Sequence, residues 1–273
     1  MNRGWSNVDP VAGPRTNDAG RGIPALPLQG DEVHVWWARL DEAAREEPPE
    51  ARAALSRDEL ERAAQFYFAS GSRRYVAGRT ILRRLLGRYL GRNPASLAFA
   101  YGRHGKPRLV SAPHRAAIFF NVTHADGLAL FAITRSDEVG IDVERVREIP
   151  EWERISAACF DPREHVRLRR VPSAHRREAF FRAWTRQEAV LKALGLGLGG
   201  PLPPAGRGAL DEFSVRTFLP APGYVAALAV ARGGCRTSCV AWPRGDPLTA
   251  GRIAQSGWPA RDGNGRGTGG EIS

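Results

Sequence analysis

Lysine is nearly absent from this chain. Of its 40 basic residues, only Lys106 and Lys192 are lysines, and the others are arginines. An ammonium group is a compact charge with three donors, whereas a guanidinium is a planar fork with five, so the two do not replace each other where the fit is tight. Both lysines are therefore candidate functional residues, with survival by chance as the alternative.

Long apolar runs and an even set of cysteines are also missing. No stretch approaches the roughly 20 apolar residues of a membrane span, and the N-terminus has no signal-peptide core. The three cysteines cannot all pair, and Cys235 and Cys239 have no second pair with which to form a zinc site. We expect free thiols, a cytoplasmic location and no membrane partner.

The two ends of the chain, residues 1–30 and 244–273, are rich in Gly, Pro and Asn, which predicts disordered extensions. Each contributes only +1 to the net charge of +11, so most of the excess lies on the ordered part and favours an anionic partner. Nothing resembles an RNA-recognition sheet, a zinc finger or a basic zipper. We therefore do not expect nucleic acid to be that partner.

The pattern of apolar residues predicts the same order of elements twice. Val33, Val35 and Trp37 alternate with His34 and Trp36, which is typical of a half-buried strand. Two helices and three short strands follow, at 51–68, 73–90, 97–101, 117–122 and 128–134. The second series has a strand at 139–144, a helix at 174–194, a hairpin of 213–218 with 224–230, and an edge strand near 239–242. This order predicts an α+β fold with an N-terminal half at 31–138 and a C-terminal half at 139–243.

The strand at 139–144 carries two carboxylates on one side. Its alternation points Asp142 and Glu144 to the same face as Gly140, and the attachment points of the two acids are about 7 Å apart. One divalent cation between them would bridge that span, and Gly140 would leave room for a ligand. The alternative is an ordinary solvent-facing side of a strand.

The helix at 174–194 places a third acid on its apolar stripe. Glu188 follows Phe181 and Trp184 at helical spacing, and a carboxylate on such a stripe needs a partner. A metal ion held by the strand would provide one, as would Lys192 one turn away. A simple surface pair between Glu188 and Lys192, worth only about 0.2 to 0.5 kcal/mol, is the alternative.

Two further strings have side chains suited to phosphate. Asn121-Val122-Thr123-His124 ends a strand with a hydroxyl and an imidazole, and Gly105-Lys106-Pro107 is a tight turn that would hold its ammonium in place. His124 is equally compatible with an ordinary turn histidine. Each string alone is weak, so their joint order and spacing carry the inference.

Together, the Gly105-Lys106-Pro107 turn, the Asn121–His124 string, Gly140-Ile141-Asp142-Val143-Glu144, and the helix Trp184-Thr185-Arg186-Gln187-Glu188-Ala189-Val190-Leu191-Lys192 resemble the motifs of the 4′-phosphopantetheinyl transferases. They are most similar to the larger, surfactin-synthetase-activating type. The resemblance runs from about residue 31 to 242. Its most specific part is the Asp-x-Glu strand followed by the Trp-x-x-x-Glu-x-x-x-Lys helix.

The resemblance implies a monomer of two α+β halves about a pseudo-twofold axis, each a helix packed on a small, mainly antiparallel sheet. Coenzyme A would bind in the cleft between the halves. Such enzymes move its phosphopantetheine arm to a serine of an apo acyl or peptidyl carrier protein and release adenosine 3′,5′-bisphosphate. The carriers serve polyketide, nonribosomal peptide or fatty-acid synthesis. The excess positive charge then has a reason, because both substrates are acidic.

The resemblance also implies roles for the acids. Asp142, Glu144 and Glu188 match the carboxylates that hold Mg²⁺ on the pyrophosphate, although oxygen ligands suit Mn²⁺ as well. Glu188 is further the expected base for the serine hydroxyl, directly or through a water. Lys192 would steady the departing phosphate.

Lys106, Thr123 and His124 match positions that contact the nucleotide phosphates, and Arg74 matches a basic residue that grips the 3′-phosphate, with Arg62 as a second candidate.

The chain departs from the family pattern at three places. Thr123 and Ala125 stand where serines are frequent, and Gln187 replaces a frequent lysine. Thr123 keeps a hydroxyl donor. Gln187 removes a charge near the expected cleft, for which Arg186 is a possible compensation. Two other functions remain open from the residues alone: a noncatalytic basic binding protein, and a metal-dependent phosphodiesterase that needs no carrier.

Overall fold

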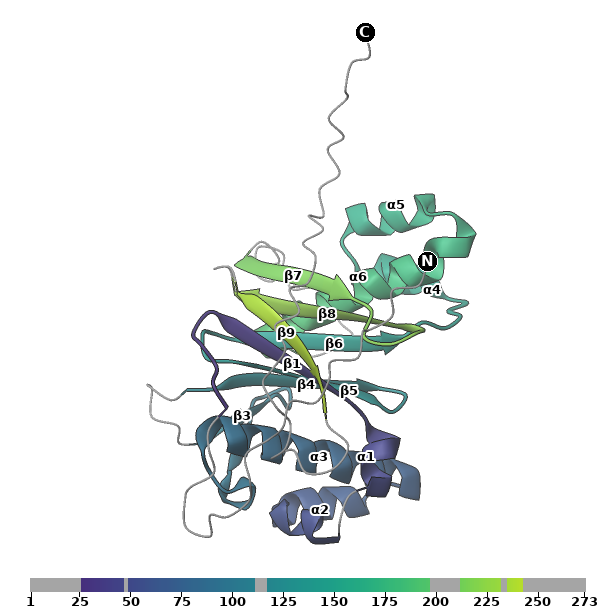
Figure 1. Cartoon of the computed structure of the whole chain (residues 1–273). Helices are drawn as coiled ribbons and strands as arrows, with labels where there is room; N and C mark the ends of the chain where they lie inside the picture. Colours follow the sequence, from purple (N-terminus) through teal and green to yellow (C-terminus); the bar gives the residue numbers. More distant parts are fainter. Residues whose placement is uncertain (1–25, 47–48, 111–116, 197–211, 232–234, 243–273) are drawn as a thin grey trace.

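The N-terminal half is a helix packed on a four-stranded sheet. The computed structural model describes residues 26–46, 49–110, 117–196, 212–231 and 235–242. The strand order is β4 (Phe119–Ala125), β5 (Leu128–Thr134), β1 (Glu32–Arg39) and β9 (Arg236–Ala241). The first three strands are antiparallel, whereas β9 runs parallel to β1. The long helix α3 (Ala69–Leu90) covers one face of this sheet (Figure 1).

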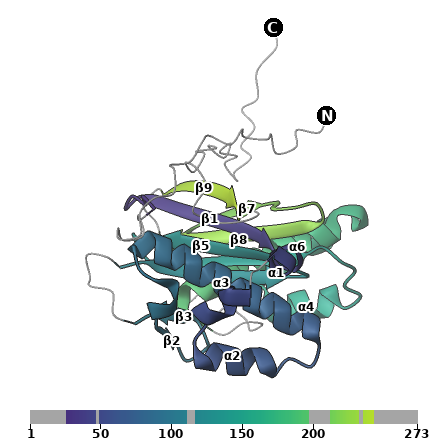
Figure 2. The ribbon, with the colours of Figure 1, turned by 60° about the horizontal axis from the view of Figure 1, so that its bottom comes forward.

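Short elements connect these parts. Between β1 and α3 lie α1 (Leu40–Glu46), a 3₁₀ turn (Pro49–Ala54) and α2 (Arg57–Ala64). After α3 come a second 3₁₀ turn (Pro94–Ser96) and the two-stranded hairpin of β2 (Phe99–Tyr101) and β3 (Pro107–Leu109). Figure 2 shows α1, α2 and α3 together on the outer side of the sheet.

The C-terminal half repeats the arrangement with three strands. Antiparallel β6 (Val139–Arg145), β8 (Tyr224–Ala231) and β7 (Phe213–Phe218) form its sheet in that order. Between β6 and β7 lie α4 (Trp152–Cys159), α5 (Pro162–Arg170) and α6 (Ser173–Leu194). Helix α6 packs on this sheet as α3 packs on the first.

The two sheets face each other, so the molecule has four layers: α3, the first sheet, the second sheet and α6. Val33 and Val35 of β1 meet Ile141 of β6 and Leu228 of β8 in the core between the sheets. The opposite faces pack on the helices: Trp36 contacts the α3 layer, and small residues of β8 such as Ala227 lie against α6. The expected α+β fold of helices on small, mainly antiparallel sheets is confirmed.

Three details differ from the sequence prediction. Strand β1 is buried on both faces rather than half-buried, because α3 covers one side and the second sheet the other. The segment 51–68 is not one helix. It contains the end of the first 3₁₀ turn and the α-helix α2, which is separated from that turn and from α3 by short non-helical stretches. The last edge strand forms, but β9 joins the sheet of the N-terminal half and so crosses the expected division. The predicted disordered ends, residues 1–30 and 244–273, lie outside the described residues except at 26–30.

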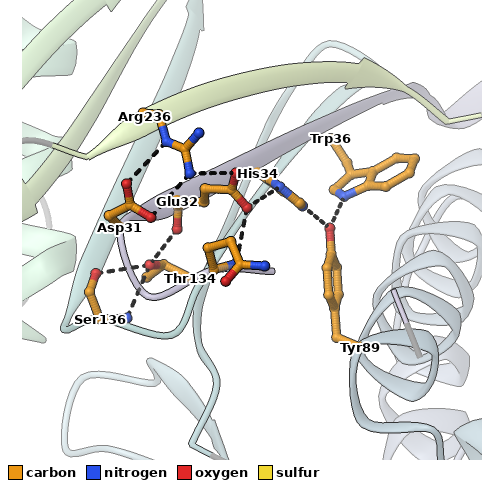
Figure 3. A network of polar contacts seen from close by, with 9 residues as sticks. Asp31, Glu32, His34, Trp36, Tyr89, Thr134, Ser136 and Arg236 are labelled. Carbon is orange, nitrogen blue, oxygen red and sulfur yellow. Dashed lines mark hydrogen bonds and ion pairs between the residues drawn. The ribbon is translucent and has the colours of Figure 1, made fainter. Parts of the chain in front are cut away.

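A buried polar network fixes β1 to both α3 and β9 (Figure 3). Tyr89 of α3 accepts a hydrogen bond from the indole of Trp36 at 2.8 Å, and its hydroxyl lies 2.7 Å from Nδ1 of His34. Because an indole can only donate, the hydroxyl of Tyr89 can donate its own proton to Nδ1 of His34. The neutral imidazole then carries its proton on Nε2, which lies 3.6 Å from the carboxylate of Glu32. Arg236 of β9 pairs with Glu32 at 3.2 Å.

The three cysteines are free thiols, as the sequence predicted. Among the described residues, no helix combines the length and the apolar character needed to cross a membrane.

Candidate active site

A close approach between helix α6 and strand β6 builds the site. A Cβ atom on Gly140 would lie 1.9 Å from the carbonyl oxygen of Ala189 and 2.5 Å from the amide nitrogen of Ala193. Glycine is therefore required here so that the helix backbone touches the strand. The expectation that Gly140 leaves room for a ligand is wrong, because the backbone of α6 fills that space.

This contact brings together side chains from three elements. The ammonium of Lys192 on α6 lies 2.6 Å from Oδ1 of Asp142 on β6 and donates to the hydroxyl of Thr123 on β4 at 3.0 Å. Thr123 in turn donates to Oδ1 of Asp142 at 3.2 Å. Asp142 and Thr123 are buried, and only 14% of the Lys192 side chain is exposed. The partner of Lys192 is thus Asp142 rather than a surface contact one turn away.

The three predicted acids form one electrostatic unit. Burial raises the pKa of Asp142, while the charge and hydrogen bond of Lys192 oppose that rise. Burial also raises the pKa of Glu144, as do the negative charges of Asp142 and Glu188. The carboxylate of Glu188 is buried on α6 beside them. The chain thus concentrates negative charge at one end of β6, which favours a cation at this place.

The donor chemistry fits a hard divalent cation. Carboxylate oxygens are the ligands that Mg²⁺ and Mn²⁺ prefer, and Oδ2 of Asp142 is buried without a hydrogen bond from the described residues. As the side chains stand, no three acidic, histidine or cysteine residues in the described ranges are grouped closely enough to form a metal centre. The ammonium of Lys192 supplies the positive charge next to Asp142 in this arrangement.

A cationic corner adjoins the acids. His124 is the next-to-last residue of β4, beside Thr123, and is exposed. Partial desolvation, then the positive charges of Lys192 and Arg74, lower the pKa of His124. Arg74, in the second turn of α3, pairs with Asp41 through two hydrogen bonds of 2.7 Å. Lys192 and Arg74 thus both lie close enough to His124 for their charges to affect its pKa.

Lys106 has a different environment. Its ammonium donates to the carboxylate of Glu138, to the carbonyl of Val139 at 3.2 Å and to the carbonyl of Ala193 at 2.9 Å. These acceptors match its three donors, so Lys106 links the β2–β3 turn of the first half to the end of α6 and the start of β6 in the second. It also lines a surface pocket of about 370 Å³.

Other predicted positions have different surroundings. Arg62 is exposed on α2, where its charge acts on Tyr75 rather than on the His124 corner. Gln187 is buried, and its amide donates to the carbonyl of Cys159 at 3.0 Å, so it joins α6 to the end of α4. Arg186 is exposed and lies near Glu164 of α5, and desolvation lowers its pKa.

Sequence reasoning missed two residues that assemble the site. The side-chain oxygen of Asn121 accepts a hydrogen bond from the amide of Ile141 at 2.8 Å and thereby connects β4 of the first half to β6 of the second. Asp41 holds Arg74. The asparagine stood inside a quoted motif, but only the facing edges of the two sheets reveal its partner, and no pattern in the sequence singles out Asp41.

Comparisons with known proteins identify the family of the chain. Residues 42–136 match a family model described as the N-terminal part of 4′-phosphopantetheinyl transferase, and residues 138–221 match the model of the 4′-phosphopantetheinyl transferase superfamily. The chain is 39% identical over 220 residues to the 4′-phosphopantetheinyl transferase HetI of Nostoc sp., covering 77% of this chain and 92% of that protein.

Two other relatives are more distant. A putative 4′-phosphopantetheinyl transferase of Synechocystis sp. is 33% identical, with 56% of this chain and 62% of that protein covered. A 4′-phosphopantetheinyl transferase of Bacillus subtilis is 28% identical, with 60% of this chain and 67% of that protein covered.

Proposed function

The chain belongs to the 4′-phosphopantetheinyl transferase superfamily, and we propose that Asp142, Glu144 and Glu188 form the acidic centre of its transfer reaction. Members transfer the phosphopantetheine arm of coenzyme A to carrier proteins, so this chain is a transferase with coenzyme A and a carrier as its substrates. The noncatalytic binding protein that the basic charge also allowed is thereby set aside.

The observation that carries the assignment is the contact of Lys192, Asp142 and Thr123 across three elements. This contact lies beside Glu188 and Glu144, so the ammonium of Lys192 and three carboxylates are clustered in one site. A group that departs as a phosphate needs a positive charge nearby, which Lys192 supplies in our proposal. Glu188 accepts the proton of the attacking serine hydroxyl, and the products are the holo-carrier and adenosine 3′,5′-bisphosphate.

Mg²⁺ is the cation that we assign to the three carboxylates, with Mn²⁺ as an alternative. Its fit rests on the oxygen donors, on the buried Oδ2 of Asp142 and on the burial that raises the pKa of Asp142 and Glu144. When bound, the ion neutralises negative charge on the pyrophosphate. Thr123, His124 and Arg74 bind the phosphates of coenzyme A. Lys106 and Arg62 enter the proposal through the resemblance alone, and Lys106 must release one of its protein acceptors to take a phosphate.

Several finer properties belong to the same proposal. We assign the chain to the larger, surfactin-synthetase-activating type, supported by the two halves within one chain, each a helix on a sheet, and by the relative from Bacillus subtilis. Both halves contribute to the site, which supports a monomer with its cleft at their junction, between residues 31–138 and 139–243. The three free thiols support a cytoplasmic location, where cysteines stay reduced.

The test is transfer of the arm from coenzyme A to a panel of apo carriers, followed by intact mass with Mg²⁺ present or removed by chelator. Asp142→Asn and Glu188→Gln should each lower kcat by about 100-fold or more, as loss of acid–base and electrostatic groups does. Glu178→Gln is the matched control, because Glu178 lies on α6 in an exposed pair with Arg182.

The assigned roles are wrong if either site variant modifies the carrier at the control's rate. Nucleotide release without any carrier would instead indicate a phosphodiesterase. Equal transfer with and without chelator would remove the metal from the proposal and leave the lysine and acids in place.

A further inference from the structure

Arg74 does not stand alone in the cationic corner. Its Nε and Nη2 atoms donate to Oδ1 and Oδ2 of Asp41, both at 2.7 Å. Asp41 lies in the first turn of α1, and close to half of each side chain is exposed. The hydrogen bond from Arg74 holds the pKa of Asp41 below its ordinary value, so the partner of the guanidinium is a full carboxylate.

The geometry of this pair leaves part of the guanidinium available. A guanidinium has five N–H groups, and Asp41 takes one from Nε and one from Nη2. The other edge consists of the N–H groups of Nη1 and the remaining N–H of Nη2. This edge can donate two parallel hydrogen bonds to a pair of phosphate oxygens. Within the described part of the chain, Asp41 is the only hydrogen-bond acceptor of Arg74. The carboxylate thus fixes the plane of the fork and occupies only one of its edges.

The turn between β4 and β5 packs against the pair. Asp126 and Gly127 both have left-handed backbone, with φ of 42° and 83°. A Cβ atom on Gly127 would lie 2.9 Å from Oδ2 of Asp41 and 3.5 Å from Nη2 of Arg74. The same turn follows His124, whose pKa the charge of Arg74 lowers. The pair is therefore held at the edge of the corner that also contains Lys192.

We propose that Asp41 is a positioning residue, which grips one edge of Arg74 and presents the other edge to a phosphate group of the bound substrate. The inference rests on the proposed function, because it takes coenzyme A as the ligand. An exposed arginine without such a partner must order its long side chain when the ligand binds, which costs affinity. The opposite role, an internal anion that competes with the phosphate, predicts a change of the opposite sign.

Calorimetric titration of coenzyme A into the full chain decides between these signs. Asp41→Ala should weaken binding about tenfold, the size expected when one charge-assisted contact is no longer pre-set. Asp31→Ala is the matched control, because Asp31 forms an exposed, two-bonded pair with Arg236 far along the sheet. In Asp41→Ala the KM for coenzyme A should rise by a larger factor than kcat falls, whereas a general structural defect would lower kcat and the free energy of unfolding together.

Arg74→Ala and the double variant complete the experiment. Arg74→Ala should weaken the binding of coenzyme A at least as much as Asp41→Ala does. The double variant should bind coenzyme A as weakly as Arg74→Ala alone, since the aspartate acts through the arginine. Repeating the titrations with 3′-dephospho-coenzyme A identifies the phosphate: the Asp41 effect disappears if it is the 3′-phosphate and persists if it is the pyrophosphate.

Tighter or unchanged binding in Asp41→Ala, with Arg74→Ala weakened, would overturn the role of Asp41 and leave the proposed function intact. Unchanged binding in Arg74→Ala would instead remove Arg74 from the substrate site.

Discussion

Gly140→Ala should damage the site without touching any reacting group. The new Cβ would lie 1.9 Å from the carbonyl oxygen of Ala189, whereas ordinary contact begins near 3.4 Å, so α6 has to move by about 1.5 Å. Because the opposing atoms are backbone, no side-chain rotation relieves the clash. The displaced helix carries Glu188 and Lys192 away from Asp142.

The expected size follows from that displacement. A shift of about 1 Å in a catalytic group costs on the order of 100-fold in rate, so kcat for arm transfer should fall by at least that factor. Overpacking should also lower the free energy of unfolding by about 1 to 3 kcal/mol. The replacement of Gly by Ala in a strand stabilises by only roughly 0.5 to 1 kcal/mol, so the net effect should be destabilising.

The assay is kcat by intact mass of the carrier, together with urea unfolding of the same preparations. Gly30→Ala is the matched control, because no atom lies within 4 Å of its added Cβ. If Gly140→Ala equals Gly30→Ala in both kcat and stability, then the close approach of α6 to β6 does not position the site, and the reasoning is refuted.

Two further predictions concern Lys192 and His34. Lys192→Arg should lower kcat at least about tenfold despite the retained charge, because the planar head does not fit between Asp142 and Thr123; near-normal kcat would show that any cation suffices. Burial lowers the pKa of His34 below 6.5, so the unfolded chain takes up its proton first as the medium is acidified. The stability from neutral His34 is therefore complete above pH about 6.5 and is lost as the pH falls through the folded-state value. In urea unfolding, the advantage of wild type over His34→Gln should shrink between pH of about 7.5 and 5; a constant advantage would contradict this.

The sequence predicted most elements because their patterns are local. The stripe of α3 that includes Ile81 and Leu85 is buried, and the alternation of β6 separates Val139 and Ile141 from Asp142. Such patterns depend only on the 3.6 and 2.0 residue periods of helix and strand. They do not state how many faces of an element are covered, which is why β1 was expected to be half-buried and is buried on both sides.

Parallel pairing of β9 with β1 joins residues about 200 positions apart, and Arg236 then reaches Glu32. No period in the sequence encodes a partner at that distance.

By itself, the sequence determined which residue types stand at which spacing: two acids on one strand face, an acid and a lysine one turn apart on a helix, and lysine kept where arginine is the rule. Only the tertiary structure decided their partners. Lys192 contacts Asp142 on another element, Asn121 joins the two sheets, and Asp41 holds Arg74. The physical reason is that spacing along one element follows from backbone geometry, whereas contacts between elements depend on how closely they pack, which Gly140 sets here.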